Sequence, residues 1–188
     1  MCYENNVSII IMLCNLNENG VNKCADYWNV HNLNNYYIKK LNRQETEGLC
    51  IRHFNLYNKM TNENKNIIQY QLLVWEDHSA LSEANFNKII QLINAVDIYR
   101  NNNPTVVHCS DGVGRTGTFI AMYCLYHEIM RQIFHEKNSP EIVFSILNLV
   151  RKIKEQRIIS VKNHYQFSLL YDFANYLLLK TNTDNYIK

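Results

Sequence analysis

The stretch that most constrains this chain is residues 105–118, Thr-Val-Val-His-Cys-Ser-Asp-Gly-Val-Gly-Arg-Thr-Gly-Thr. The β-branched run Thr105–Val107 predicts a short buried strand, and the apolar residues from Phe119 onward predict a helix. Between them lies a glycine-rich loop, whose backbone N–H groups can turn inward toward a bound anion. This order of strand, glycine loop and helix N-terminus predicts an anion-binding cradle, because the helix dipole favours negative charge there.

Two side chains give this cradle a chemistry. Cys109 stands at the end of the predicted strand, and Arg115 follows on the other side of the glycines. A thiol attacks only as the thiolate, and inward N–H donors, a helix N-terminus and a neighbouring guanidinium all favour that form. The planar guanidinium can also hold two phosphate oxygens at once. The Thr116 hydroxyl is close enough in sequence to hydrogen-bond the leaving thiolate.

Two other interpretations explain this loop less well. A glycine-rich turn around a buried cysteine would not require specific residues at most of ten consecutive positions. A nucleotide-binding P-loop shares the spacing of Gly112 and Gly117. That loop requires Lys at position 118, where this chain has Thr, and has no reason to carry His-Cys before its glycines.

Residues 108–117, His-Cys-Ser-Asp-Gly-Val-Gly-Arg-Thr-Gly, resemble the signature loop of the protein tyrosine phosphatases, His-Cys-x-x-Gly-x-Gly-Arg-[Ser/Thr]-Gly. The resemblance implies hydrolysis of phosphotyrosyl proteins through a cysteinyl-phosphate intermediate, with no metal or other cofactor. It assigns Cys109 as nucleophile, with His108 in support and Thr116 beside the thiolate. The phosphate-binding positions that it implies are Ser110, Asp111, Gly112, Val113, Gly114 and Arg115.

A second segment resembles the mobile proton-donor loop of the same family. Trp75-Glu76-Asp77-His78 stands where relatives have Trp-Pro-Asp, and the 32 positions from Asp77 to Cys109 fit the family's interval. The resemblance assigns Asp77 as the acid that protonates the leaving tyrosine, with Trp75 in support. Glu76 replaces the family's Pro and removes a fixed φ, so we expect a slower enzyme with a shifted pH optimum.

Residues 18–28 are similar to the family's Glu-x-Gly-x-x-Lys-Cys-x-x-Tyr-Trp segment. The resemblance assigns Glu18 as the salt-bridge partner of Arg115, and it places Lys23 at the rim of the pocket. From the residues alone, both are interpreted as surface charges at a turn.

The segment before the last predicted helix departs from the family. Relatives have Gln-Thr-x-x-Gln-[Tyr/Leu]-x-Phe here, with two glutamines that position the hydrolytic water. Matching Phe167 to the final Phe puts Ser160 and His164 at the two glutamine positions. The first half-reaction, phosphoryl transfer to Cys109, is therefore better supported than the second.

Hydrophobic periodicity predicts an α/β fold. We expect a twisted mixed β-sheet flanked by helices, with residues 1–188 forming a single, partial phosphatase domain. Relatives carry roughly a third of their domain before the segment equivalent to Tyr3-Glu4, including a loop that stacks on phosphotyrosine. The predicted strands are 8–13 (a central strand), 36–41, 49–57, 67–75 and 105–107, and the predicted helices are 82–101, 115–135, 141–155 (with Ser139 and Pro140 at its start) and 163–180.

Composition narrows the partners and the compartment. A net charge of +2 argues against nucleic acid, including an RNA 5′-phosphatase role, and against a membrane surface. The apolar run Val7–Cys14 is too short to cross a bilayer. A thiolate enzyme needs a reducing compartment, so we expect a cytoplasmic protein, with the nucleus also open. No CxxC pair or Cys/His ligand spacing occurs, so five of the six cysteines are predicted to be buried thiols and no metal site is expected.

Two function classes stay open at this point. The first is an active phosphatase, since Cys109, Arg115 and Asp77 are all present. The second is a weak or inactive pseudophosphatase that binds phosphotyrosyl proteins, since Ser160 and His164 replace the glutamines. Asp111 argues against phosphoinositide substrates, whose phosphatases tend to carry basic residues there. The asparagine-rich composition and the degenerate loops resemble phosphatases carried by polydnaviruses (bracoviruses) of parasitoid wasps.

Overall fold

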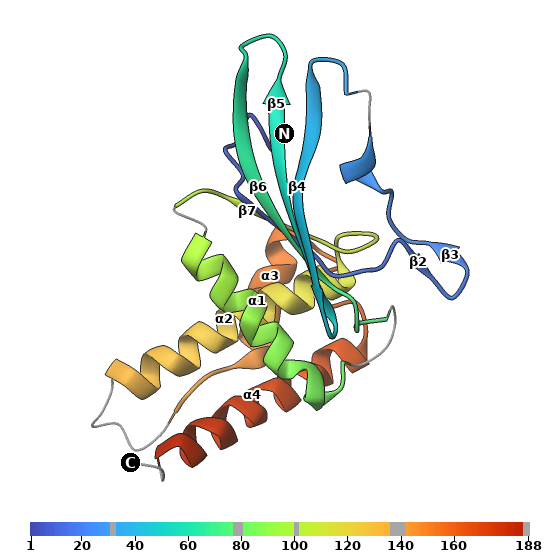
Figure 1. The fold of residues 1–188 in the computed structure, drawn as a ribbon. Coiled ribbons are helices and arrows are strands. Elements are labelled where there is room, and N and C mark those ends of the chain that lie inside the picture. The colour runs from blue at the N-terminus through green and yellow to red at the C-terminus, as the bar shows by residue number, and fades with distance from the viewer. Residues whose placement is uncertain (31–32, 77–80, 100–101, 136–141, 186–188) are drawn as a thin grey trace. The chain divides into compact units, whose positions relative to one another are not determined.

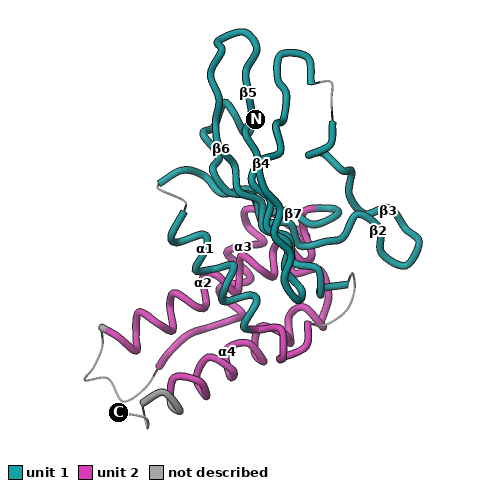
Figure 2. The backbone as a smooth tube through the Cα atoms, viewed as in Figure 1, with its two compact units in different colours: residues 1–77, 87–111 teal, residues 78–86, 112–188 magenta. Residues whose placement is uncertain are grey.

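The computed structural model describes residues 1–30, 33–76, 81–99, 102–135 and 142–185 (Figure 1). The chain divides into two compact units, residues 1–77 with 87–111, and residues 78–86 with 112–188 (Figure 2). The expectation of a single domain over residues 1–188 therefore stays a prediction. Within the described part of the chain, no helix combines the length and the apolar character that crossing a membrane requires.

The first unit is built on a five-stranded mixed sheet with the strand order β4-β5-β6-β1-β7 (Figure 1). Strands β4, β5 and β6 pair antiparallel, whereas β1 runs parallel to both β6 and β7. The predicted mixed sheet with an internal first strand is confirmed. The strands are β1 (Ile9–Met12), β4 (Tyr36–Thr46), β5 (Leu49–Asn58), β6 (Glu63–Leu72) and β7 (Thr105–His108).

The pairing of β1 with β7 positions the candidate site. All four residues of β1 are buried, as expected for a strand that has a neighbour on each side. The edge strand β7 is only half-buried, which corrects the prediction of a buried strand at Thr105–Val107. Met12 lies opposite His108, and the Leu13 backbone nitrogen donates to the His108 carbonyl at 2.8 Å. Because the strands are parallel, the loops that follow both of them leave the same edge of the sheet.

A small hairpin follows β1 in the chain. Strands β2 (Asn17–Glu18) and β3 (Val21–Asn22) form the hairpin, and Asn19 and Gly20 at its turn have φ values of 52° and 81°. Positive φ at both turn positions is typical of a type I′ turn.

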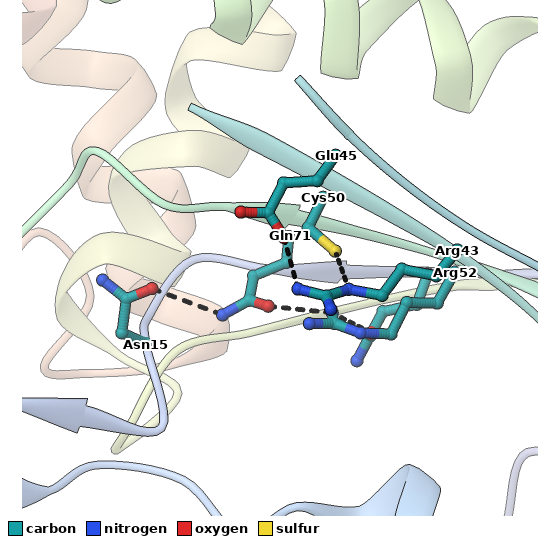
Figure 3. A network of polar contacts seen from close by, with 7 residues as sticks. Asn15, Arg43, Glu45, Cys50, Arg52 and Gln71 are labelled. Carbon is teal, nitrogen blue, oxygen red and sulfur yellow. Dashed lines mark hydrogen bonds and ion pairs between the residues drawn. The ribbon is translucent and has the colours of Figure 1, made fainter. Parts of the chain in front are cut away.

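The polar network connects β5 and β6 to the loop after β1 (Figure 3). The Arg52 guanidinium donates to the side-chain oxygens of Gln69 and Gln71, at 2.8 Å each. Gln71 in turn donates to the Cys14 carbonyl at 2.9 Å, and the Arg52 guanidinium lies 4.2 Å from the centre of the Trp28 ring. These buried bonds fix the backbone at Cys14, because an unmade hydrogen bond would be costly there.

Helix α1 (Phe86–Tyr99) belongs to the first unit from Asn87 onward, and its buried face includes Ile89, Leu92, Ile93 and Val96. The second unit is helical, with α2 (Gly114–His135), α3 (Ile146–Gln156) and α4 (His164–Asn185). Helix α2 packs against both α3 and α4. Phe86, which also belongs to this unit, packs edge-on against Phe173 with 5.3 Å between ring centroids.

The start of α3 differs from the predicted start at Ser139 and Pro140. The helix begins at Ile146, with the Ser145 side chain as an N-cap that accepts a bond from the Asn148 nitrogen. Ahead of it, Gln132 on α2 bonds both the nitrogen and the carbonyl of Val143, at 2.8 and 2.7 Å. The side chain of Gln132 therefore makes the hydrogen bonds of the Val143 backbone that a longer helix would have made within itself. Residues 136–141 lie outside the described part of the chain.

Candidate active site

The nucleophile half of the loop belongs to the first unit. Cys109 follows β7 directly and is 5% exposed, while Ser110 and Asp111 are exposed. The Cys109 thiol donates a hydrogen bond to the Asp111 carboxylate at 3.3 Å. The nucleophile is therefore in contact with a carboxylate of its own loop.

The contacts of His108 determine its tautomer. Its Nδ1 lies 3.0 Å from the Cys109 carbonyl oxygen, which can only accept, so Nδ1 carries a proton. Burial lowers the pKa of His108 and favours the neutral ring, in which Nε2 is an acceptor. The Tyr27 hydroxyl lies 2.9 Å from Nε2, and it accepts from the Gln69 amide at 2.5 Å. These contacts form a chain of hydrogen bonds. Gln69 donates to Tyr27, Tyr27 donates to His108, and His108 donates to the backbone carbonyl of Cys109.

The arginine half of the loop belongs to the second unit. Helix α2 begins at Gly114, so Arg115 and Thr116 lie in its first turn. Arg115 is 1% exposed, an unusual position for a guanidinium, since a buried charge is costly unless it is compensated. The Thr116 hydroxyl is buried and has no hydrogen-bond partner among the described residues. A buried hydroxyl donor is thus available where the helix begins.

The glycines of this half are required by close packing within the second unit. A Cβ on Gly117 would lie 2.6 Å from the Ser160 Cβ, and one on Gly114 would lie 2.9 Å from the Gln166 amide nitrogen. Gly112 has a φ of +70°, a conformation that side chains rarely adopt. Of these three, Gly112 is therefore needed for its backbone conformation and Gly117 for space against the backbone of Ser160 and Val161, whereas a side chain at Gly114 would displace the Gln166 amide.

Two buried side chains contact the glycines at the start of α2. Ser160 was predicted from the sequence, whereas Gln166, in the first turn of α4, was not. Ser160 is 2% exposed and contacts Gly117, but His164 is exposed at the first position of α4. Gln166 is 2% exposed, its amide nitrogen faces Gly114, and its oxygen accepts from the Lys162 backbone nitrogen at 2.8 Å.

The sequence analysis missed Gln166, although a clue was present. If the second glutamine of the family motif is set on Gln166, the motif begins at Lys162 and Asn163 takes the position of Thr. The structure has Asn163 in a capping role, since its side chain accepts from the Gln166 backbone nitrogen at 2.9 Å. A two-residue shift in the match would have replaced His164 by Gln166.

The other predicted residues are placed one by one. Glu18 is buried and accepts from the Asn15 backbone nitrogen at 2.9 Å, so it is not the surface charge that the residues alone suggest. Lys23 is half-buried, Trp75 is fully buried and Glu76 is exposed. Asp77, the predicted proton donor, lies outside the described residues, and the predicted pairing of Glu18 with Arg115 stays a prediction.

Comparison with known proteins identifies the family. The sequence model described as protein-tyrosine phosphatase matches residues 1–176. The chain belongs to the protein-tyrosine phosphatase family. Rat tyrosine-protein phosphatase non-receptor type 20 is 33% identical over 174 residues, which cover 89% of this chain and 39% of that protein. Tyrosine-protein phosphatase 2 of Dictyostelium discoideum is 30% identical over 177 residues, covering 90% and 46%.

Solved structures show the protein-tyrosine phosphatase fold as well. The catalytic domain of human protein tyrosine phosphatase non-receptor type 18 superimposes with a TM-score of 0.79 at 22% identity, covering 92% of this chain and 61% of that one. A complex of the same phosphatase with HER2 phosphopeptides gives 0.79 and 22%, covering 93% and 59%. The predicted fold class is confirmed. The chain spans less than half of the length of the two curated relatives above.

Proposed function

We propose that this chain hydrolyses phosphotyrosyl proteins through a cysteinyl-phosphate intermediate. The observation that carries the proposal is an intact family signature at residues 108–117 in a chain that belongs to the family. The local structure supports it, because Cys109 follows a strand directly and Arg115 lies in the first turn of a helix. Complexes of a related fold with phosphopeptides support phosphotyrosyl proteins as the substrate class.

In the first step, the Cys109 sulfur attacks phosphorus, a P–S bond forms and the bond from phosphorus to the tyrosine oxygen breaks. The sulfur, which contacts the Asp111 carboxylate at 3.3 Å, attacks as the thiolate. Arg115 and the loop amides bind the equatorial oxygens, and Asp77 gives its proton to the departing tyrosine. Thr116 donates to the sulfur, a role supported by its buried, available hydroxyl.

In the second step, water attacks phosphorus, the P–S bond breaks and Cys109 is regenerated. We assign Gln166, with Ser160, to the positioning of this water in place of His164. Gln166 is supported by its burial and by its amide at the start of α2, whereas His164 is exposed. Lys162 takes the position of the motif's first glutamine, so the site has one such amide and not two.

The supporting roles of Glu18 and Lys23 remain part of the proposal. Glu18 stays the proposed partner of Arg115, because the family resemblance assigns that role and both side chains are buried charges. The chemistry also supports a cytoplasmic location, because a catalytic thiolate must stay reduced.

A rapid-mixing assay on para-nitrophenyl phosphate tests the proposal. For an enzyme, we expect sustained release of phosphate by the wild type and none by Cys109→Ser. The second candidate is a pseudophosphatase that traps its substrate, and the observation in its favour is Lys162 at the motif's first glutamine. Trapping would give one burst of nitrophenol without continued turnover. Activity retained by Cys109→Ser would overturn both.

A further inference from the structure

Three potential metal ligands from distant parts of the sequence meet in the first unit. The sulfurs of Cys14 and Cys24 and a ring nitrogen of His108 all lie within 4.8 Å of one another. Cys14 and His108 are neighbours because β1 and β7 are parallel and end at the same edge of the sheet. Cys24 reaches them from the end of the β2–β3 hairpin, where its backbone nitrogen bonds the Leu16 carbonyl.

We propose that Cys14, Cys24 and His108 bind one Zn²⁺ ion. Two thiolates and one imidazole are a ligand set that zinc prefers, with bond lengths of about 2.3 Å to sulfur and 2.0 Å to nitrogen. Tetrahedral bonds of these lengths hold ligand atoms roughly 3.5–4 Å apart. The observed spacing needs only a small contraction to reach this. Three protein ligands leave the fourth position to water.

The tautomer of His108 suits this role. Its Nδ1 proton is donated to the Cys109 carbonyl, so the lone pair is on Nε2. Metal-binding histidines are commonly oriented by such a bond to a backbone carbonyl. The Tyr27 hydroxyl that now donates to Nε2 would move to the ion's water or remain beside it.

The charges around the cluster favour a cation. One Asp26 carboxylate oxygen is buried and has no hydrogen-bond partner among the described residues. The other oxygen of this carboxylate accepts from the Asn29 side-chain amide, and the negative charge of the group attracts a divalent ion. Binding of Zn²⁺ releases the two thiol protons, so the pair of sulfurs changes from neutral to doubly negative as the ion enters.

The cluster is open to solvent on one side. A surface hollow reaches Cys24, and it is lined by Leu16, Asn22, Lys23, Cys24, Ala25 and Asp26. Cys14 is fully buried, whereas Cys24 and His108 are half-buried. An ion can therefore reach Cys24 first and then bind the deeper ligands.

Titration of the reduced, metal-free full chain with Co²⁺, followed by competition with Zn²⁺, tests the site without using turnover. We expect one ion per chain, with a visible tetrahedral Co²⁺ spectrum and a thiolate charge-transfer band, both removed by Zn²⁺. Cys14→Ser and Cys24→Ser should each weaken binding by more than about 100-fold, because loss of a ligand costs more than loss of an outer-shell partner. Cys109→Ser and Cys124→Ser are the matched thiol controls and should bind as the wild type does.

Several results would overturn the site. These are absence of stoichiometric Co²⁺ binding, an unchanged spectrum in Cys24→Ser, or loss of the spectrum in Cys109→Ser, which would place the ion on the catalytic thiol. A Cys14–Cys24 disulfide found in the chain kept under reducing conditions would also overturn it. If the buried Cys14→Ser does not fold, Cys24→Ser decides, since its side chain is half-exposed. The thermal midpoint of Cys24→Ser without metal shows whether this variant folds. Addition of Zn²⁺ should then raise the midpoint of the wild type but not that of Cys24→Ser.

Discussion

The Tyr27 hydroxyl lies 2.9 Å from the Nε2 of His108, the residue that precedes the candidate nucleophile. The same hydroxyl accepts from Gln69, so a tyrosine outside the signature loop can donate to a histidine inside it, whose tautomer the Cys109 carbonyl determines. Nε2 of that ring is an acceptor for the hydroxyl, and Nδ1 bonds the Cys109 backbone carbonyl. The loop thus depends on the β6 strand as well as on its own residues.

We expect Tyr27→Phe to lower the free energy of unfolding by roughly 1–3 kcal/mol, because the buried Gln69 amide loses its oxygen acceptor and keeps only the weak contact with the Met12 sulfur. Urea denaturation followed by circular dichroism measures the change. Tyr57→Phe is the matched control, since its hydroxyl bonds Asn62 at an exposed position. A loss of similar size in both variants would show that the Tyr27 contact is not the cause.

Gln166→Ala should slow the second half-reaction and leave the first intact. Without the amide, the attacking water is misplaced, and such misplacement lowers the rate by roughly 10²-fold. The burst of nitrophenol should keep its amplitude while the steady rate falls. His164→Ala, at an exposed position of the same helix, should keep the wild-type steady rate. The reverse pattern would restore His164 to the role that the family motif first suggested.

Gly117→Ala should destabilise the chain by roughly 1–3 kcal/mol through overpacking. The new methyl would lie 2.6 Å from the Ser160 Cβ and 2.9 Å from the Val161 backbone nitrogen. Val161 cannot easily move, because its φ of 53° is already held in a region that β-branched residues avoid. Combination with Ser160→Gly should recover part of the loss, measured as a coupling free energy in a double-mutant cycle. Simple additivity of the two changes would rule this contact out as the cause.

Acid sensitivity should be traceable to Glu128. Hydrogen bonds from Arg131 and then from Gln132 hold the pKa of this carboxyl below its usual 4.5. A lowered pKa in the fold contributes stability above the unfolded pKa, and that stability is lost as the pH falls through the folded value.

Glu128→Gln should therefore cost a few tenths of a kcal/mol near neutral pH, a small amount because the pair is exposed. Thermal midpoints of wild type and variant should converge only as the pH falls below the lowered pKa of the folded carboxyl, where the wild-type side chain is also neutral. A difference that stays constant to lower pH would contradict this account.

The sequence was sufficient for the parts of the molecule that local patterns determine. The run Ile9–Met12 is apolar throughout, and the structure buries all of it between two strands. The β-branched residues before His108 and the glycines after it predicted a strand, a loop and a helix in the observed order. Such features depend on neighbours in sequence, which is why they could be predicted.

Other features depend on tertiary contacts and could not be predicted locally. The start of α3 follows from bonds between Gln132 and Val143, which no capping pattern around Pro140 reveals. The position of Gln166 follows from its packing against Gly114, and a motif match anchored on Phe167 misses it by two residues. Cys14, Cys24 and His108 have no metal-ligand spacing in the sequence, because the sheet and the hairpin bring them together.

The alignment of Met12 with His108 rests on two strands of only four residues each. Side chains alternate between the faces of a strand, so a slip of a single position would carry the imidazole through to the opposite face. Tyr27 would then lose its partner, and the cysteine after the strand would be displaced by about 3.3 Å. An inserted residue between Thr105 and Cys109 would therefore change the position of the nucleophile itself.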